Sequence, residues 1–265
     1  MSAIDFHTHA FPDALAKRAM AKLEASSGPW KAKGSGTIKG LLASMDKADI
    51  DVSVLCPIAT KPDQVKGILD WCDEVRSDRI EPFPSIHPQT PDPLGWLEQF
   101  AEAGYAGIKL HPMYQDFAAD DPSMFAVYGA CADLGLAVAF HCGLDIAFAD
   151  DDDRADPRRM RNIIDRFPDL KLVATHMGGW HQWDQARELL VGTPVYLETS
   201  LSLAELEPAA AVEMIRAHGA DRVLLGSDWP WAFQKENIAI LNSLGLNEAD
   251  LRNILWSNAA KLLGY

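Results

Sequence analysis

The sequence lacks the features that would place it in a membrane or on nucleic acid. No apolar run approaches the ~20 residues that a membrane-spanning helix needs. Basic residues are in the minority, since 24 Lys and Arg stand against 38 Asp and Glu and the net charge is −14. Proteins that bind nucleic acid or anionic membranes use basic patches. We therefore expect neither kind of partner, and a small molecule as the substrate.

Cysteine is also scarce. The chain of 265 residues has four, without CxxC spacing: Cys56, Cys72, Cys131 and Cys142. In a chain of this size they indicate free thiols in a reducing compartment. The start of the sequence is polar and lacks the apolar region of a secretory signal. These features predict a soluble cytoplasmic protein. The sequence leaves the oligomeric state open, with a homodimer as one candidate.

A third absence is a GxGxxG loop after any predicted strand, which argues against a dinucleotide-binding fold. The sequence instead alternates strands and helices. Short strands are predicted at 1–9, 52–56, 80–86, 105–110, 136–140, 170–175, 195–198 and 223–226. Several are apolar on both faces, as parallel strands covered by helices must be. Eight such units in one domain, residues 1–265, predict an α/β fold, the (β/α)8 TIM barrel, with an open doubly wound sheet as the alternative.

The helical segments and one insertion complete the predicted pattern. Helices are predicted at 38–48, 64–75, 93–103, 122–134, 157–167, 183–190 and 203–218, with two or three more at the C-terminal end. The insertion, residues 10–37, combines a predicted helix at 13–25 with a stretch rich in glycine and serine. We expect it either to cover a site as a lid or to form a passive surface loop.

The first strand ends in Ile4-Asp5-Phe6-His7-Thr8-His9. Alternate side chains of a strand point to the same face. We therefore expect Asp5, His7 and His9 to face one way, with Asp5 one layer below as a hydrogen-bonding support for a neighbouring imidazole or backbone group. Two imidazoles two residues apart can reach one metal ion together.

Chemically active residues also stand at the carboxyl ends of other predicted strands. They are His87 after the third strand, Lys109 and His111 at the fourth, His141 at the fifth, His176 at the sixth and Asp228 at the eighth. Six of the eight histidines lie at strand ends. In a barrel these ends meet on one rim, where TIM-barrel active sites form. The pattern therefore predicts a site that unites residues far apart in the sequence.

Several neutral imidazoles with one carboxylate suit Zn²⁺ or a similar divalent ion. Such an ion lowers the pKa of bound water to about 7 and so supplies hydroxide near neutral pH. Asp228 could bind the ion and also take the proton from that water. His176 could polarise a substrate carbonyl or stabilise the oxyanion that forms.

These motifs resemble those of the amidohydrolase superfamily, in particular its amidohydrolase-2 branch, which includes aminocarboxymuconate semialdehyde decarboxylase-like proteins. The resemblance covers nearly the whole chain. It rests on His7-Thr8-His9, His141, His176-Met177-Gly178-Gly179, Ser227-Asp228-Trp229-Pro230 and the closing segment 258–264.

The resemblance implies a barrel with one or two divalent metal ions per chain, zinc being the first candidate. The ligands that it implies are His7, His9, His141 and Asp228. His176 would be a catalytic histidine beside one ion or a ligand of a second. Lys109 has three alternatives: a carboxylated lysine that bridges two ions, a cation that holds a substrate carboxylate, or a lysine without a role in the site.

The leading prediction is a metal-dependent hydrolase that acts on a small amide, lactone or other ester. Asp228 would shuttle the proton of the attacking water, and His176 would help to hold the oxyanion. The alternative is a metal-dependent decarboxylase, a carbon–carbon lyase acting on an unsaturated carboxylic acid, in which Lys109 would anchor the carboxylate. A barrel that binds metal or ligand without turnover is the third interpretation.

Other residues near the predicted rim have simpler interpretations beside a functional one. His111 could contact the substrate, because it shares a face with the lysine of its strand, or could be a turn residue. Trp229 could wall a pocket for a ring-shaped substrate or pack in the core. His87 is expected in a turn, and His181 and His218 in structural roles.

Overall fold

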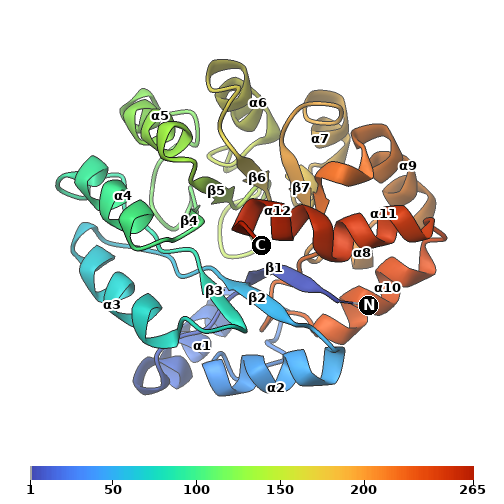
Figure 1. Ribbon diagram of the computed structural model, residues 1–265, viewed down its shortest axis with the longest axis horizontal. Helices are drawn as coiled ribbons and strands as arrows, with labels where there is room; N and C mark the ends of the chain where they lie inside the picture. Colours follow the sequence, from blue (N-terminus) through green and yellow to red (C-terminus); the bar gives the residue numbers. More distant parts are fainter. Residues whose placement is uncertain (1) are drawn as a thin grey trace.

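Eight short parallel strands stand at the centre of the structure, and helices surround them (Figure 1). The computed structural model describes residues 2–265. The strands are β1 (Ile4–Thr8), β2 (Val52–Leu55), β3 (Ile80–Pro82), β4 (Gly107–Leu110), β5 (Ala137–Phe140), β6 (Leu172–Ala174), β7 (Tyr196–Glu198) and β8 (Val223–Leu224). The eight predicted strands are therefore present, and the predicted TIM-barrel class is confirmed.

The strands pair in sequence order in two sheets, β1-β2-β3 and β4-β5-β6-β7-β8. Backbone hydrogen bonds also cross the two gaps between these sheets. Phe6 N–H on β1 donates to the carbonyl of Leu225, just after β8, at 2.8 Å. Lys109 N–H on β4 donates to the carbonyl of Pro84, just after β3, at 3.0 Å. The two sheets are thus joined at both edges, as a (β/α)8 barrel requires.

Helices follow the strands nearly as predicted. They are α1 (Asp13–Ser26), α2 (Ile38–Ala48), α3 (Val65–Val75), α4 (Pro93–Glu102), α5 (Phe125–Leu134), α6 (Pro157–Arg166), α7 (Trp183–Leu189), α8 (Ser202–Glu205), α9 (Pro208–His218), α10 (Gln234–Ser243), α11 (Glu248–Arg252) and α12 (Asn258–Leu263). The predicted single helix 203–218 is wrong, because it is divided into α8 and α9. Leu206 is extended between them, and Pro208, which suits the first turn of a helix but not its interior, begins α9.

Apolar side chains fill the interior of the barrel. Phe6 on β1 meets Phe83, just beyond β3, edge to face, with ring centroids 5.4 Å apart. Ala139 and Val173 belong to the same buried cluster. A larger apolar cluster lies between the strands and the helices around them. The strands are therefore covered on both faces, which is the reason for their continuous apolar character.

The first strand departs from regular alternation. Its pairing with β2 shifts by one residue between Asp5 and Thr8. Phe6 lies in the interior cluster, yet the next residue, His7, also points inward, where it contacts side chains of β4 and β7. The predicted common face with His7 and His9 is therefore wrong for Asp5, which turns toward α10 instead. A bulge of this kind redirects a side chain next to a site.

The insertion, residues 10–37, contains α1, as predicted. Its loop is joined to the loop after β8, where Lys33 N–H donates to the carbonyl of Pro230 at 2.6 Å. Trp30 of the same loop packs edge to face on Trp180, which follows β6, with ring centroids 5.9 Å apart. The insertion therefore contacts loops at the carboxyl-terminal end of the barrel, and its role as a lid stays a prediction.

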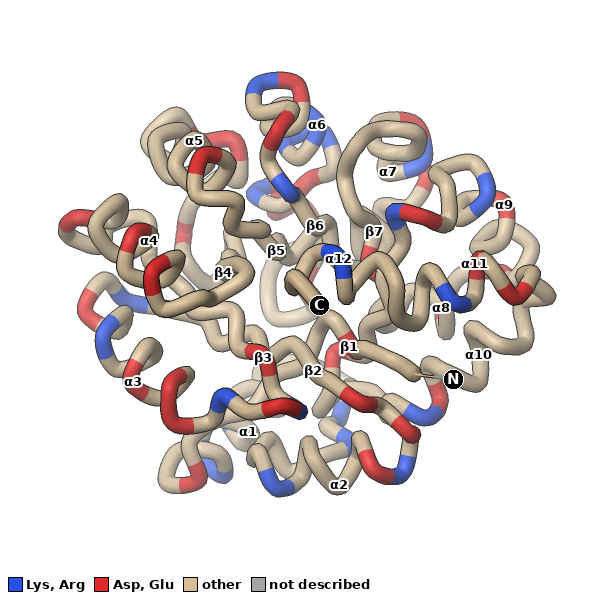
Figure 2. Tube along the Cα trace, viewed as in Figure 1, with Lys and Arg blue, Asp and Glu red and all other residues tan. Residues whose placement is uncertain are grey.

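Figure 2 shows the charged residues along the outer helices and their connecting loops, while the central strands carry few of them. This distribution agrees with the apolar packing in and around the strands. Among residues 2–265, no helix combines the length and the apolar character needed to cross a membrane.

Candidate functional site

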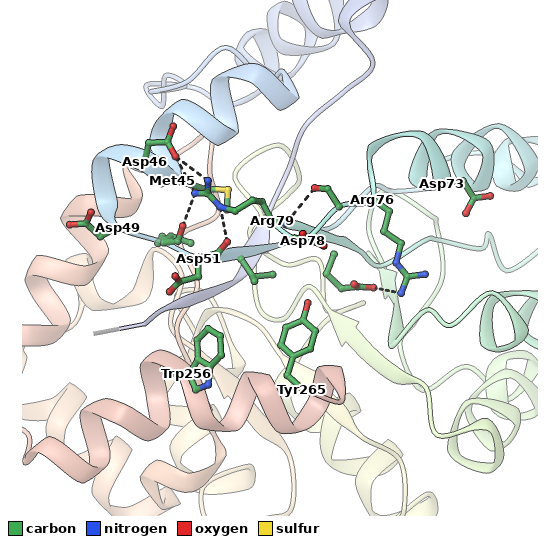
Figure 3. Close-up of a pocket in the computed structure, with 14 residues that line it drawn as sticks. Met45, Asp46, Asp49, Asp51, Asp73, Arg76, Asp78, Arg79, Trp256 and Tyr265 are labelled. Carbon is green, nitrogen blue, oxygen red and sulfur yellow. Dashed lines mark hydrogen bonds and ion pairs between the residues drawn. The ribbon is translucent and has the colours of Figure 1, made fainter.

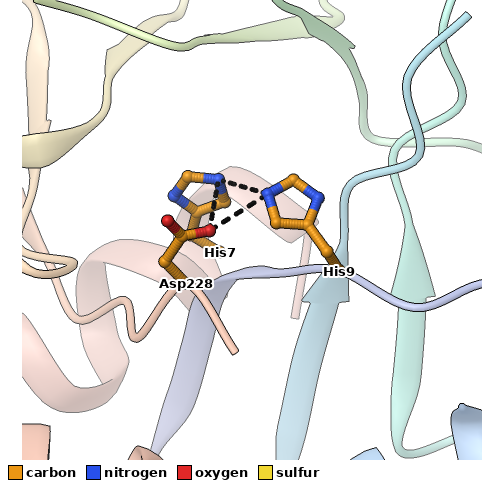
Figure 4. A group of neighbouring side chains, drawn as sticks. All are labelled: His7, His9 and Asp228. Carbon is orange, nitrogen blue, oxygen red and sulfur yellow. Dashed lines mark hydrogen bonds and ion pairs between the residues drawn. The ribbon is translucent and has the colours of Figure 1, made fainter. Parts of the chain in front are cut away.

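Three predicted metal ligands meet at the carboxyl-terminal end of β1 (Figure 4). The Nε2 atoms of His7 and His9 are 3.1 Å apart. Asp228 Oδ1 lies 3.1 Å from His9 Nε2 and 3.7 Å from His7 Nε2. His7 and Asp228 are buried, and His9 is partly buried. The two ends of the sequence form this group because the first strand and the loop after the eighth are neighbours in the barrel.

The hydrogen bonds of the two imidazoles turn their lone pairs toward one another. His9 Nδ1 is 2.7 Å from the carbonyl oxygen of Cys56, which can only accept, so Nδ1 carries the proton. His7 Nδ1 is 3.0 Å from Glu198 Oε2 and donates to it when that carboxylate is ionised. Each neutral ring then presents an unprotonated Nε2 to the other. A carbonyl or carboxylate behind the imidazole is the usual support of a metal-bound histidine.

The spacing of the three atoms also fits a metal ion. Ligands placed tetrahedrally at ~2.0–2.1 Å from zinc are about 3.3 Å apart. The distances here, 3.1, 3.1 and 3.7 Å, lie around that value. Imidazole and carboxylate suit other divalent ions as well. The group of His7, His9 and Asp228 could therefore hold a divalent metal ion.

Lys109 approaches this group from β4. Its Nζ lies 3.1 Å from His7 Nε2, and its side chain is fully buried. Within residues 2–265 this ammonium forms no ion pair with a carboxylate. Buried charges are normally paired. Lys109 thus has no carboxylate partner in the part of the chain that the structure describes, and its three predicted roles stay open.

His176 and His141 form a pair beside the first group. His176 Nε2 lies 3.1 Å from His141 Nδ1, and His141 Nε2 lies 3.0 Å from the carbonyl oxygen of Leu144. The ring centroids of His7 and His176 are 5.3 Å apart. The structure thus brings His176 next to the predicted ligands. Both ring nitrogens of His141 face other partners, so His141 does not share the point where the other three predicted ligands meet.

His111, after β4, stacks on His141. The rings are 14° from parallel with centroids 4.1 Å apart, and His111 Nε2 lies 3.4 Å from Asp145 Oδ2. These three residues are close enough to be considered as a second metal site. An imidazole nitrogen binds an ion in the plane of its ring, however, and stacked rings direct their lone pairs along parallel lines. The arrangement favours a stacked, hydrogen-bonded pair over a shared ion.

A sequence model of the family Amidohydro_2, described as amidohydrolase, matches residues 4–265. The chain belongs to the amidohydrolase family. The resemblance predicted from the strand-end motifs is thereby confirmed, and the protein is an enzyme of this family. A gamma-resorcylate decarboxylase of Polaromonas sp. (strain JS666) is 27% identical to it over 120 residues. That segment spans only 38% of this chain and 36% of the decarboxylase.

Solved structures resemble this amidohydrolase over its whole length. An uncharacterised TIM-barrel protein, Bb4693 of Bordetella bronchiseptica, has a TM-score of 0.79 and 19% identity, covering 100% of this chain and 99% of the other. A 5-carboxyvanillate decarboxylase of Novosphingobium aromaticivorans, complexed with manganese and 4-hydroxy-3-methoxy-5-nitrobenzoic acid, has a TM-score of 0.73 and 15% identity, covering 99% and 96%. At these identities the structures support the fold.

Two residues of the amidohydrolase site were not predicted from the sequence. Glu198, the last residue of β7, and Ser200 are fully buried and contact His7. Burial raises the pKa of Glu198 to about 8, although hydrogen bonds from Ser200 favour its ionised form. The signal that could have revealed them is their position, because β7 ends at the same rim as the strands that carry the histidines.

Two predicted catalytic residues have left-handed backbone conformations. The φ angle is 57° at His176 and 61° at Asp228. This region is unfavourable for most residues other than glycine, although aspartate tolerates it better than most. Such conformations persist where the surrounding structure enforces them, and they gather at functional sites. His176 lies two residues after β6 and Asp228 in the loop after β8, so the backbone of these connections sets the direction of each side chain.

Burial determines the charges of the site. It lowers the pKa of His7 and of His141 well below their usual range, and it lowers the pKa of His176 to about 4. Burial alone would raise the pKa of Asp228, but its contact with His9 and the positive charge of Lys109 lower it below its ordinary value. At neutral pH these buried imidazoles are neutral and Asp228 is ionised. These are the forms in which histidine and aspartate bind metal.

Trp229 and His87 are the two remaining residues predicted near the rim. The indole of Trp229 is 1% exposed, and a Cβ added to Gly34 of the insertion would lie 2.6 Å from it. Its contact with substrate stays a prediction. His87 lies in a turn, as predicted, where its Nδ1 accepts a hydrogen bond from the Gln89 N–H at 3.1 Å.

A cavity of about 1180 Å³ lies at the opposite, amino-terminal end of the strands (Figure 3). Its two arginines are already paired with the protein, Arg79 with Asp46 at 3.1 Å and Arg76 with Glu81 at 3.2 Å. TIM-barrel active sites form at the carboxyl-terminal ends of the strands. The cavity is therefore separate from the candidate site of this amidohydrolase.

Proposed function

We propose that the protein is a metal-dependent decarboxylase acting on an unsaturated or aromatic carboxylic acid. The observation that carries the proposal is the buried ammonium of Lys109, 3.1 Å from His7 Nε2 and without a carboxylate partner among residues 2–265. The carboxylate of a substrate would pair with this charge. The similarity to gamma-resorcylate decarboxylase over 120 residues supports the same choice. The hydrolase interpretation becomes the second candidate.

We assign the metal ion to His7, His9 and Asp228, at one ion per chain, with zinc as the first candidate. Their Nε2 and Oδ1 atoms are the set whose lone pairs converge. His141, the fourth predicted ligand, would have to leave His176 or the carbonyl of Leu144 to join them. A divalent cation held there supplies positive charge that attracts and polarises substrate oxygen atoms.

Aromatic side chains beside His111 suit a planar substrate. The rings of Tyr114 and Phe148 meet edge to face with centroids 5.0 Å apart, and both are partly exposed. His111 contacts Tyr114 with centroids 4.6 Å apart. Aromatic faces and edges bind planar rings favourably. We therefore assign His111 to substrate binding, with Trp229 as part of the wall behind Asp228.

The reaction consumes one proton: R–COO⁻ + H⁺ gives R–H and CO₂. The bond between R and the carboxylate carbon breaks, its electron pair stays on R, and the proton forms the new C–H bond. We assign Asp228 and His176 to proton transfer. Both are in their basic forms at neutral pH, because their pKa values are lowered. Each therefore takes up a proton from solvent or from a substrate hydroxyl before it can deliver one.

The test is release of CO₂ from a panel of unsaturated and aromatic carboxylic acids, measured beside hydrolysis of lactones and N-acyl compounds. We expect CO₂ release. We also expect a metal content near one ion per chain in the wild-type protein and a lower metal content in His7→Ala and Asp228→Asn. Hydrolysis without CO₂ release would overturn the decarboxylase in favour of the hydrolase. Bound metal without turnover of any class would favour a binding barrel. Two ions per chain would favour a carboxylated Lys109.

A further inference from the structure

The hydroxyl of Ser200 lies at the centre of three buried groups of the site. Its Oγ is 2.8 Å from Glu198 Oε2, 2.9 Å from His176 Nδ1 and 3.1 Å from His7 Nδ1. All four side chains are at most 1% exposed, so water does not compete for these bonds. Two of the partners are imidazoles, one on β1 and one just after β6, and the third is the carboxyl group behind a predicted metal ligand.

The three partner atoms would otherwise resemble a metal site. The ligand atoms of His7, His176 and Glu198 lie within 4.8 Å of one another. A hydroxyl has one proton to donate and two lone pairs to accept with, which together serve three partners. Ser200 therefore fills with hydrogen bonds the position that an ion would take.

The directions of these bonds follow from the backbone carbonyl at the far end of the network. His141 Nε2 must donate to the carbonyl of Leu144, which leaves Nδ1 of the neutral ring as an acceptor. His176 Nε2–H then donates to His141 Nδ1. His176 Nδ1 is consequently an acceptor, and the Ser200 hydroxyl donates a hydrogen bond to it. His7 Nδ1–H is left to donate to the oxygens of Ser200 and Glu198. The 2.8 Å contact between Ser200 Oγ and Glu198 Oε2 then uses the proton of Glu198, whose pKa burial raises to about 8.

We propose that Ser200 is a positioning residue that holds His176 in the Nε2–H tautomer and fixes its ring relative to the pair of His7 and Glu198. The main-chain carbonyl of Ser200 lies 3.2 Å from the same Nδ1 atom of His176 and can only accept. Without the hydroxyl, this carbonyl favours the Nδ1–H tautomer. His176 Nε2 and His141 Nδ1 would then face each other as two lone pairs, and their contact would be lost.

This inference deepens the proposed function and rests on it only for the choice of reaction to measure. The test compares Ser200→Ala with Ser202→Ala, a matched control two residues further on at the start of α8, whose hydroxyl accepts from Trp183 Nε1 at 3.2 Å. The readouts are the ¹⁵N NMR signals of the histidine rings, metal content, and kcat and KM separately. His176 signals are assigned by their absence in His176→Gln.

We expect Ser200→Ala to move His176 to the Nδ1–H tautomer and to lower kcat about 10-fold to 100-fold, with little change in KM. Metal content stays near the wild-type value, because Glu198 still supports His7. Ser200→Thr, which keeps the hydroxyl, restores the Nε2–H signal, and Ser202→Ala leaves the wild-type pattern. If Ser200→Ala does not fold, the same measurements are made on Ser200→Cys, whose thiol is of similar size and a weaker hydrogen-bond donor.

An unchanged His176 tautomer in Ser200→Ala, or in Ser200→Cys, would overturn the proposal. The same holds if kcat does not change while the tautomer does. If the wild-type protein releases no CO₂ from any acid, the proposed reaction fails, yet the tautomer comparison still decides the role of Ser200.

Discussion

Asp5 on β1 accepts two hydrogen bonds from Ser227, a residue 222 positions away in the sequence, one from its N–H at 2.9 Å and one from its hydroxyl at 2.5 Å. Gln234 Nε2 donates to the same carboxylate at 2.7 Å. The next residue, Asp228, donates its N–H to the carbonyl of His7 at 2.8 Å. These bonds hold the loop after β8 against β1 and so set Asp228 opposite His7 and His9.

Ser227→Ala should destabilise the fold. It removes the hydroxyl donor of a fully buried carboxylate and also the acceptor of the Trp229 N–H, which is 3.0 Å from Ser227 Oγ. We expect the free energy of unfolding to fall by about 1.5–3 kcal/mol, the usual range for a hydrogen bond to a charged group. Urea denaturation measures it, with the exposed Ser35→Ala as control. Equal stability of both variants would contradict the role given to Asp5.

The rim could be predicted because its residues follow recognisable strands. His7, His141, His176 and Asp228 each come directly after or within a short apolar segment, and the carboxyl ends of parallel strands meet in a barrel. Strand and helix positions follow from the apolar pattern, whereas the choice of His7, His9 and Asp228 as ligands is what the resemblance to the amidohydrolase family implies. The pairing of His176 with His141 also depends on this convergence, although the sequence does not specify which atoms meet.

The parts that could not be predicted depend on shifts of one residue or on backbone atoms. The bulge in β1 turns Asp5 away from His7, and no residue type marks it. The orientation of His141 depends on the carbonyl of Leu144, which any residue at that position would supply. Ser200 matters through the atoms that it faces across the barrel, and a serine after a strand is otherwise a common residue.

Lys109→Met tests the three alternatives for this lysine. Methionine is close to lysine in length and has no charge. If the ammonium binds the substrate carboxylate, we expect KM to rise about 10-fold to 100-fold, which corresponds to ~1.5–3 kcal/mol, with unchanged metal content. Metal analysis and steady-state kinetics measure the effect. Lys171→Met, at an exposed lysine that donates to the carbonyl of Gly135, is the control. Loss of one of two metal ions would instead indicate a carboxylated lysine. An unchanged KM and an unchanged metal content would indicate a lysine without a role in the site.

Trp30→Ala tests the insertion as a lid. Its indole packs on Trp180, whose ring centroid is 5.8 Å from that of His176, so the insertion is connected to the site through two aromatic contacts. We expect KM to rise about 3-fold to 10-fold when this contact is removed, while Trp30→Phe keeps most of the affinity. Thermal unfolding should change little. A KM equal to the wild-type value in Trp30→Ala would identify a passive loop.

His218 should make stability depend on pH away from the site. Its ring is buried, its Nδ1 accepts from the Gly192 N–H at 3.2 Å, and its Nε2 donates to the carbonyl of Val195 at 2.9 Å. The bond from Gly192 needs the neutral ring, because a protonated Nδ1 cannot accept, and burial lowers the pKa of His218 below its ordinary value of 6.5. Above that value the ring is neutral in both the folded and the unfolded chain. As the pH falls below it, the unfolded chain binds a proton that the folded chain refuses, so stability is lost.

His218→Gln should remove this contribution. Between the ordinary pKa and the lowered one, a full proton of difference corresponds to about 1.4 kcal/mol of unfolding free energy per pH unit. We therefore expect the wild-type protein to lose stability more steeply below pH ~6.5 than His218→Gln, although the variant starts lower because it has lost two fitted hydrogen bonds. Urea denaturation at a series of pH values measures both slopes, with the exposed His181→Gln as the matched control. Parallel slopes for wild type and His218→Gln would mean that the buried ring accepts its proton without cost, which the Gly192 N–H facing Nδ1 does not allow.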